Sequence, residues 1–301
     1  MLNVCCVPMV VSKPCAGARV DYLAGNGHAA PARYDLRMNH RDIGDHLKQW
    51  RQRRHLSQLE LATELDISAR HLSFVETGRS QPSRGMVLRL AERLEVPLRE
   101  RNSLLVAAGF APMYASRPLT DPALSSARAA VELVLAGHEP YPALLVDRYW
   151  NVVSMNRAVA PFLVGVAPAL LTEPLNALRV SLHPDGVAPR IENLAQWRAH
   201  SLARVARDVE VSADPALAAL LAEMRAYPGG EVDLSAEDFN GVLIPLRLRT
   251  PAGTLSMFTT TTVFGSAVEV TLSELVLEAF YPADEFTAQT LRRLAGESPA
   301  G

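Results

Sequence analysis

Apolar residues recur at helical spacing from residue 41 onwards, after an opening stretch that shows neither helical nor strand periodicity. Three of them follow one another at intervals of four and three residues within the charged segment IGDHLKQWRQRR: Ile43, Leu47 and Trp50. Such a stripe predicts an amphipathic helix that buries one face. Residues 1–37 fit either a disordered tail or residues upstream of a natural start at Met38.

Two short helices follow with almost no space between them. Ser57 and, three residues later, Glu60 form a capping-box signature, which predicts a helix over residues 58–65. Its expected inward residues are Leu59, Ala62 and Leu65. A second helix is expected between Ser68, a good N-cap residue, and Gly78, a residue suited to the position after a helix end.

The second of these helices has two unlike faces when its residues are placed about 100° apart. One face carries Leu72, Val75 and Glu76. Its start, the opposite face and the flanks carry small, polar, basic and aromatic residues: Ser68, Ala69, Arg70, His71, Ser73, Phe74 and Thr77. A helix-turn-helix, whose second helix enters the DNA major groove, needs such a face. A plain helical hairpin is the alternative that this geometry leaves open.

Two further apolar stripes predict two more helices. The first stripe consists of Val87, Leu90, Ala91 and Leu94, and the second of Leu98, Leu104, Leu105 and Ala108. Together with the three helices before them, they complete an all-α, five-helix domain over residues 38–112.

The segment LSQLELATELDISARHLSFVETGRSQPS (56–83) resembles the DNA-binding helix-turn-helix of the XRE/Cro/C1 phage-repressor-like regulators. The matching positions are Leu56, Ser57, Gln58, Glu60, Leu61, Ala62, Ser68, Glu76, Gly78, Pro82 and Ser83. The family usually has glycine in the turn where this chain has Asp66, a residue that tolerates the left-handed conformation acceptably. The resemblance implies that double-stranded DNA is a partner.

The resemblance also implies roles for single residues. It assigns base edges to Arg70, His71 and Phe74, and it assigns the phosphate backbone to Arg79, Gln81 and Gln58, the last of which can also reach the outermost base. The chemistry agrees, because Arg70 can donate two hydrogen bonds to guanine and Phe74 can pack on a thymine methyl. Glu76 faces inward instead, and the family pattern pairs it structurally with Arg51 of the first helix.

Beyond a proline-rich linker (113–124), the pattern changes to alternating strands and helices. A helix is expected over 125–136, and a hairpin of strands 143–146 and 150–154 follows it, with a turn at Asp147 and Arg148. Asn156 is expected to start another helix. Three further runs are expected to be strands: 242–248, 255–263 and 268–280.

This α+β arrangement resembles a PAS-type sensor domain, and the segment NALRVSLHPDGVAPRIENLAQWRAH (176–200) resembles the ligand-binding domain of MmyB-like transcription regulators. The resemblance covers most of 125–295 and implies a pocket for a small apolar ligand, with fatty acids as the leading class. Candidate pocket residues, which fit a plain core equally well, are Trp150, Asn156, Phe162, Trp197 and Met257. Candidate anchors for a ligand carboxylate are His183, Arg190 and Arg198.

Composition and motifs narrow the function further. The net charge is −2, but residues 38–112 hold 12 Lys and Arg against 9 Asp and Glu, which favours a polyanionic partner for that domain. All three cysteines lie within the first fifteen residues, so the folded body has no disulfide framework and no cysteine-based metal site. No apolar run reaches the ~18 residues of a membrane-spanning helix.

The sequence therefore predicts a cytoplasmic bacterial regulator with no cofactor other than a bound fatty acid. Because one head reads only a few base pairs, we expect a homodimer on a pseudo-palindromic operator. The predicted segments are an N-terminal extension (1–37), the helix-turn-helix domain (38–112), the linker (113–124), the sensor domain (125–295) and a tail (296–301). A small-molecule-modifying enzyme or a haem sensor with a DNA-binding head is the alternative, and the chain lacks the common catalytic motifs that the enzyme would need.

Overall fold

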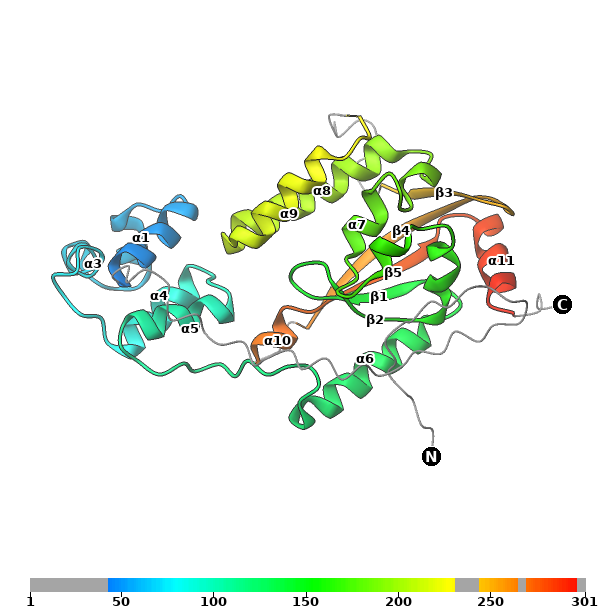
Figure 1. Ribbon diagram of the computed structural model, residues 1–301. Coiled ribbons are helices and arrows are strands. Elements are labelled where there is room, and N and C mark those ends of the chain that lie inside the picture. Colours follow the sequence, from blue (N-terminus) through cyan, green and yellow to red (C-terminus); the bar gives the residue numbers. More distant parts are fainter. Residues whose placement is uncertain (1–42, 231–243, 265–268, 297–301) are drawn as a thin grey trace.

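The computed structural model describes residues 43–230, 244–264 and 269–296. A helical domain lies at one end of the molecule and an α+β domain at the other, joined by the chain that precedes α6 (Figure 1). The fold class predicted from the sequence is confirmed. The predicted extension 1–37 lies outside the described residues.

Five short helices build the N-terminal domain around one apolar core. They are α1 (Ile43–Arg53), α2 (Gln58–Glu64), α3 (Ala69–Glu76), α4 (Arg84–Arg93) and α5 (Leu98–Ala107). Side chains start three of them, because Ser57, Ser68 and Ser83 each accept a hydrogen bond from a backbone N–H in the first turn of α2, α3 and α4. The expected left-handed turn residue Asp66 has φ +54°.

The inward face of α2 differs from the one expected. Leu59 is 66% exposed, and Leu61 is buried in its place beside Ala62 and Leu65. At about 100° per residue, Leu61, Ala62 and Leu65 share a narrow arc, while Leu59 lies well outside it. The inward face of α2 is therefore defined by Leu61, Ala62 and Leu65, and Leu59 does not belong to it.

The C-terminal domain is built on a five-stranded antiparallel sheet with the order β2-β1-β5-β4-β3. The strands are β1 (Ala143–Val146), β2 (Val152–Met155), β3 (Leu246–Thr250), β4 (Gly253–Val263) and β5 (Val276–Pro282). Its α-helices are α6 (Ser125–Gly137), α7 (Ala177–Leu182), α8 (Leu194–Ser212), α9 (Pro215–Ala226), α10 (Val270–Ser273) and α11 (Glu285–Leu294). Short 3-10 helices complete it: η1 (Pro122–Leu124), η2 (Arg157–Leu163), η3 (Pro168–Leu171) and η4 (Ala188–Arg190).

The two faces of the sheet pack against different partners. Helix α6 contributes Val131 and Leu135 to a small core with side chains of β1 and β5. The opposite face packs against α7, α8 and α9 and forms the larger core of the domain. Residues alternate between the faces along β5, so Leu277 faces α6 whereas Glu278 reaches the α8 side.

Two local expectations for this domain were wrong. Trp150 was expected in a strand, but it lies in the turn before β2 with φ +64°. The run 268–280 was expected to be one strand, but it contains α10, because the Glu269 carboxylate accepts hydrogen bonds from Leu272 N and from Arg117 N in the linker. The helix expected to start at Asn156 is present as the 3-10 helix η2, with Asn156 at its N-cap position and without a side-chain cap hydrogen bond.

Candidate functional sites

Helix α3 presents one face to the core and the other to solvent. Leu72, Val75 and Glu76 are buried, whereas Arg70 and Thr77 are exposed. Four further candidates lie on or beside the outward side and are partly exposed: Ala69, His71, Ser73 and Phe74. Ser68 fixes the start of the helix by accepting a hydrogen bond from His71 N (3.1 Å).

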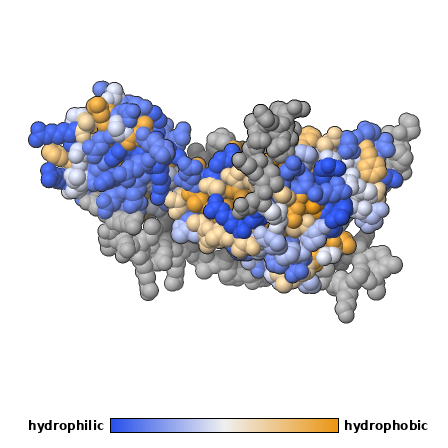
Figure 2. Space-filling model, turned by 90° about the horizontal axis from the view of Figure 1, so that it is seen from above, coloured by the Kyte–Doolittle hydropathy of each residue, from blue (hydrophilic) through white to orange (hydrophobic). Residues whose placement is uncertain are grey.

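Two guanidinium groups flank the ring of Phe74 on this outward face. The Cζ atom of Arg70 lies 5.3 Å from the ring centroid and that of Arg79 lies 5.9 Å away. A cation over an aromatic face is stabilised by the ring quadrupole, by about 0.5–1 kcal/mol at an exposed site. Arg79 and Gln81 lie in the exposed loop between α3 and α4. The face seen from above in Figure 2 is mostly hydrophilic over the helical domain at its left.

A buried ion pair holds α3 against α1. Arg51 donates from Nε to Glu76 Oε1 (2.6 Å) and from Nη2 to Glu76 Oε2 (2.8 Å). The hydrogen bond and charge of Glu76 raise the pKa of Arg51, although burial opposes this. Gln58 donates its side-chain amide to the same carboxylate (2.8 Å), so the start of α2 is fixed to α3. The contact of Gln58 with DNA stays a prediction.

An apolar cavity of about 140 Å³ lies between the sheet and its helical cover in the C-terminal domain. Most of its walls are leucine, valine and aromatic side chains, and four residues singled out from the sequence line it: Trp150, Phe162, Trp197 and Met257. A mostly apolar lining with few polar groups is typical of a site for small apolar ligands.

One end of the cavity is polar, and α8 and β5 build it. Arg204 donates from Nη1 to Glu278 Oε2 (2.9 Å) and from Nη2 to Glu278 Oε1 (2.5 Å), and its guanidinium lies 4.8 Å from the ring of Trp150. Burial lowers the pKa of His200, and the nearby charges of Arg204 and Arg207 lower it further, although the charge of Glu278 opposes this.

The sequence did not single out this polar end, although it contained two signals. Glu278 is an acidic residue inside the otherwise apolar strand VLEAFYP. Trp197, His200 and Arg204 recur at intervals of three and four, so they share one face of α8. Only the fold places that face over Glu278, because 74 residues separate Arg204 from its partner.

The remaining candidates do not line the cavity. Asn156 is buried and bonds to Ala143 N and to two backbone carbonyls, so it joins β1 to the end of α6. His183 accepts a hydrogen bond from Asp185 N, and Arg190 donates to the carbonyl of Phe162. Arg198 donates to the carbonyls of Arg225 and Gly230. The role of these residues toward a ligand stays a prediction.

Within the described residues, no cluster of three or more His, Cys, Asp and Glu side chains could hold a metal ion. No helix among them is long and apolar enough to cross a membrane.

Two family profiles match the chain. The profile described as the MmyB-like transcription regulator ligand binding domain matches residues 127–294, which is more than half of the chain. The profile described as helix-turn-helix matches residues 47–101. No curated protein matches the chain.

Proposed function

Because the chain belongs to the MmyB-like transcription regulators, with an XRE-type helix-turn-helix followed by a ligand-binding domain, we propose that it binds a specific operator as a homodimer and senses a small apolar ligand, with fatty acids as the leading class. The observation that supports the proposal most directly is an apolar cavity in the domain that follows the helix-turn-helix. A regulator of this kind acts on chromosomal DNA, so we place it in the bacterial cytoplasm.

Helix α3 is the proposed reader of base sequence. Arg70 donates two hydrogen bonds to guanine O6 and N7, and Phe74 packs on a thymine methyl in the next step of the groove. Arg79, Gln81 and Gln58 contact phosphates, and the N-termini of α2 and α4, which Ser57 and Ser83 cap, suit the DNA backbone. The contact of Arg70 with the Phe74 ring supports this reading, because it holds the guanidinium on the outward face before DNA is bound.

The proposed ligand lies with its chain among the apolar walls and its head group at the polar end. Arg204 and His200 line the cavity there, whereas His183, Arg190 and Arg198 do not. Arg204 and His200 are therefore the proposed anchor for a ligand carboxylate. Glu278 already occupies two nitrogens of Arg204, so an anionic head group must share that guanidinium. An alcohol of the same chain length needs only one hydrogen bond there.

Ligand binding by the cavity and operator binding by the head are tested in separate measurements. Native mass spectrometry and thermal unfolding with tetradecanoic acid and tetradecanol test the cavity, and we expect bound mass and a raised Tm for at least the acid. Selection of duplexes from a random pool tests the head, and we expect enrichment of a sequence with two-fold symmetry. A chain that binds neither lipid contradicts the proposed ligand sensing. A chain that enriches no sequence contradicts the proposed operator binding.

A further inference from the structure

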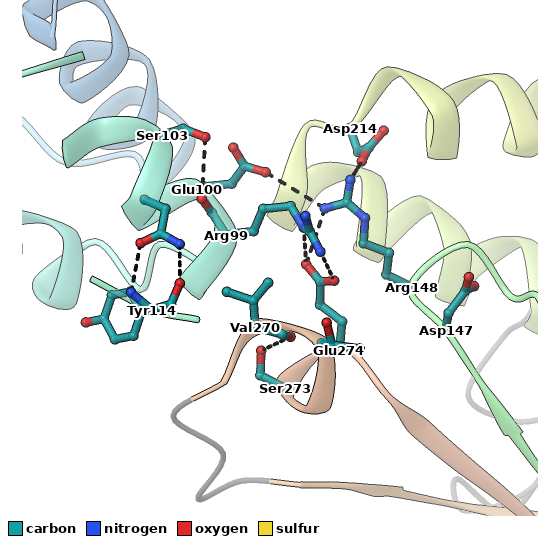
Figure 3. Close-up of polar contacts among 12 residues, drawn as sticks. Arg99, Glu100, Ser103, Tyr114, Asp147, Arg148, Asp214, Val270, Ser273 and Glu274 are labelled. Carbon is teal, nitrogen blue, oxygen red and sulfur yellow. Dashed lines mark hydrogen bonds and ion pairs between the residues drawn. The ribbon is translucent and has the colours of Figure 1, made fainter. Parts of the chain in front are cut away.

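A cluster of charged side chains joins the two domains (Figure 3). Helix α5 of the DNA-binding domain contributes Arg99, which donates from Nε and Nη2 to the two carboxylate oxygens of Glu274 at 2.7 and 2.8 Å. Glu274 directly follows α10, and 175 residues separate the partners. The contact therefore fixes the last helix of the head to the ligand-binding domain.

Arg148 lies at the centre of this cluster. Its Nη1 is 3.4 Å from Glu274 Oε1 and 4.0 Å from Glu100 Oε1 of α5, and its Nη2 is 2.6 Å from Asp214 Oδ2 at the start of α9. Two arginines thus face three carboxylates, and burial raises the pKa of Glu100. If Arg148 moved away, Arg99 alone would offset the charges of Glu100, Glu274 and Asp214, so the position of Arg148 affects how well α5 fits.

The turn that positions Arg148 also forms part of the cavity wall. Asp147 Oδ1 accepts hydrogen bonds from Tyr149 N (2.8 Å) and Asn151 N (2.9 Å), and Trp150 N donates to the carbonyl of Asp147 (3.0 Å). Trp150 lines the cavity under Arg204. Because the turn is tied together by its own hydrogen bonds, a displacement of Trp150 carries Arg148 with it.

Glu274, like Arg148, is close in sequence to a residue that lines the cavity. Glu274 lies four residues before Glu278, which pairs with Arg204 at the polar end. The linker reinforces the contact, since Val270 N of α10 donates to the carbonyl of Ala115 (2.8 Å). Arg148 and Glu274 therefore lie within four residues of Trp150 and Glu278, respectively, which both line the cavity.

We propose that Arg148, Glu274, Arg99 and Glu100 form a latch that couples the cavity to the DNA-binding head, so that a ligand against Trp150 and Arg204 shifts Arg148 and Glu274 and changes how α5 is held. This inference rests on the proposed function. A ligand changes the equilibrium between the latched and released arrangements only to the extent that it binds them unequally. The coupling is reciprocal, so operator DNA changes ligand affinity by the same factor.

The test uses the full chain, tetradecanoic acid as the probe and an operator duplex recovered by selection. The variant Arg148→Gln removes the central charge of the latch without touching the cavity lining. The matched control is Arg179→Gln, which breaks the paired contact of Arg179 with Glu223 (2.7 and 2.8 Å) within the same domain, away from the head. Glu274→Gln replaces Arg148→Gln if that variant does not fold.

For the wild-type chain and the control, we expect the lipid to change operator affinity within the usual range of about 5- to 150-fold. For Arg148→Gln, we expect unchanged lipid binding and an operator affinity that no longer responds to the lipid. Full coupling in Arg148→Gln overturns the latch and leaves the proposed function intact.

A wild-type chain that binds the lipid without any change in operator affinity contradicts the sensing half of the proposed function instead. The latch is then tested without ligand. Amide hydrogen exchange of α5 is measured in the full-length wild type, Arg148→Gln and Trp150→Phe. Faster exchange in both variants, and not in Arg179→Gln, supports it. Unchanged exchange in α5 overturns it.

Discussion

Glu76 receives hydrogen bonds from two residues, Arg51 and Gln58, that come from different helices. Removing one partner of a buried pair leaves the other charge without compensation, whereas replacing both with apolar residues removes the problem. The pair joins α1 to α3, which carries the proposed DNA contacts, and we expect it to make no contact with DNA itself.

We predict that Arg51→Ala lowers the free energy of unfolding by about 3–5 kcal/mol, because it leaves Glu76 buried beside apolar residues. The double variant Arg51→Met with Glu76→Leu recovers much of that loss. Urea unfolding of the three chains measures both effects. An unchanged midpoint for Arg51→Ala would show that the pair contributes nothing to stability.

Arg70 and Arg79 both contact the ring of Phe74, but we predict different losses when each is removed. Arg70→Ala costs about 1–3 kcal/mol on the best operator and relaxes preference at one base position. Arg79→Ala weakens binding to all duplexes alike and flattens the dependence on salt, because it removes a phosphate contact. Titrations on specific and random duplexes distinguish them, and equal losses for Arg70→Ala on both would exclude it as a base reader.

Glu100 is the residue where pH should act on the domain contact. Burial raises the pKa of its carboxyl, and Asp214 and Glu274 add to this, although Arg148 and Arg99 oppose it. An acid whose pKa is raised on folding destabilises the fold once it ionises, so the cost is absent below its unfolded pKa of about 4.3 and grows as pH rises through the folded value. We predict that Glu100→Gln raises the Tm at pH 7 and that the gain disappears near pH 4. A gain that is larger at pH 4 than at pH 7 has the opposite sign and contradicts this.

Local signals predicted the helical domain well because three of its helices, α2, α3 and α4, begin with a serine that caps the first turn. Ser57, Ser68 and Ser83 specify helix starts through bonds within three residues, so no tertiary information is needed. The inward side of α2 depended on the packing of Leu61, which spacing alone did not determine.

The C-terminal domain was harder to predict because its elements depend on distant partners. Helix α10 interrupts an apolar run since Glu269 bonds to Arg117 across 152 residues of sequence. The polar end of the cavity needs α8 and β5 to meet, and no local pattern encodes that meeting. The aromatic residues of the cavity were found because large apolar side chains near a sheet are candidates for either a core or a pocket.

We predict that Glu269→Ala destabilises this region by about 1–3 kcal/mol, because two backbone N–H groups lose a charged acceptor. Limited proteolysis should then cut faster within residues 113–124. The exposed residue Glu285 provides the control Glu285→Ala, which we expect to leave both the Tm and the proteolysis rate unchanged. Equal cleavage of the two variants would show that Glu269 does not secure the linker.

In the whole molecule, a polar contact region joins the DNA-binding head to the domain that holds the apolar cavity. The outward face of α3 and the cavity are on different domains, so a ligand in the cavity has to act on DNA binding from a distance, and the connection between the domains is a direct route. The linker adds to that connection, because Asn102 of α5 bonds to Met113 N and to the backbone of Tyr114. The head and the start of the linker therefore form one structural unit.

The coupling between ligand and operator is tested by titrating the full-length chain onto its selected operator, with and without tetradecanoic acid, and following fluorescence anisotropy at fixed salt. Native mass spectrometry of the same samples reports whether the cavity is filled. We predict tight, sequence-specific binding whose Kd changes by about 5- to 150-fold when the lipid is bound. A filled cavity with the same Kd as the empty protein would contradict this prediction.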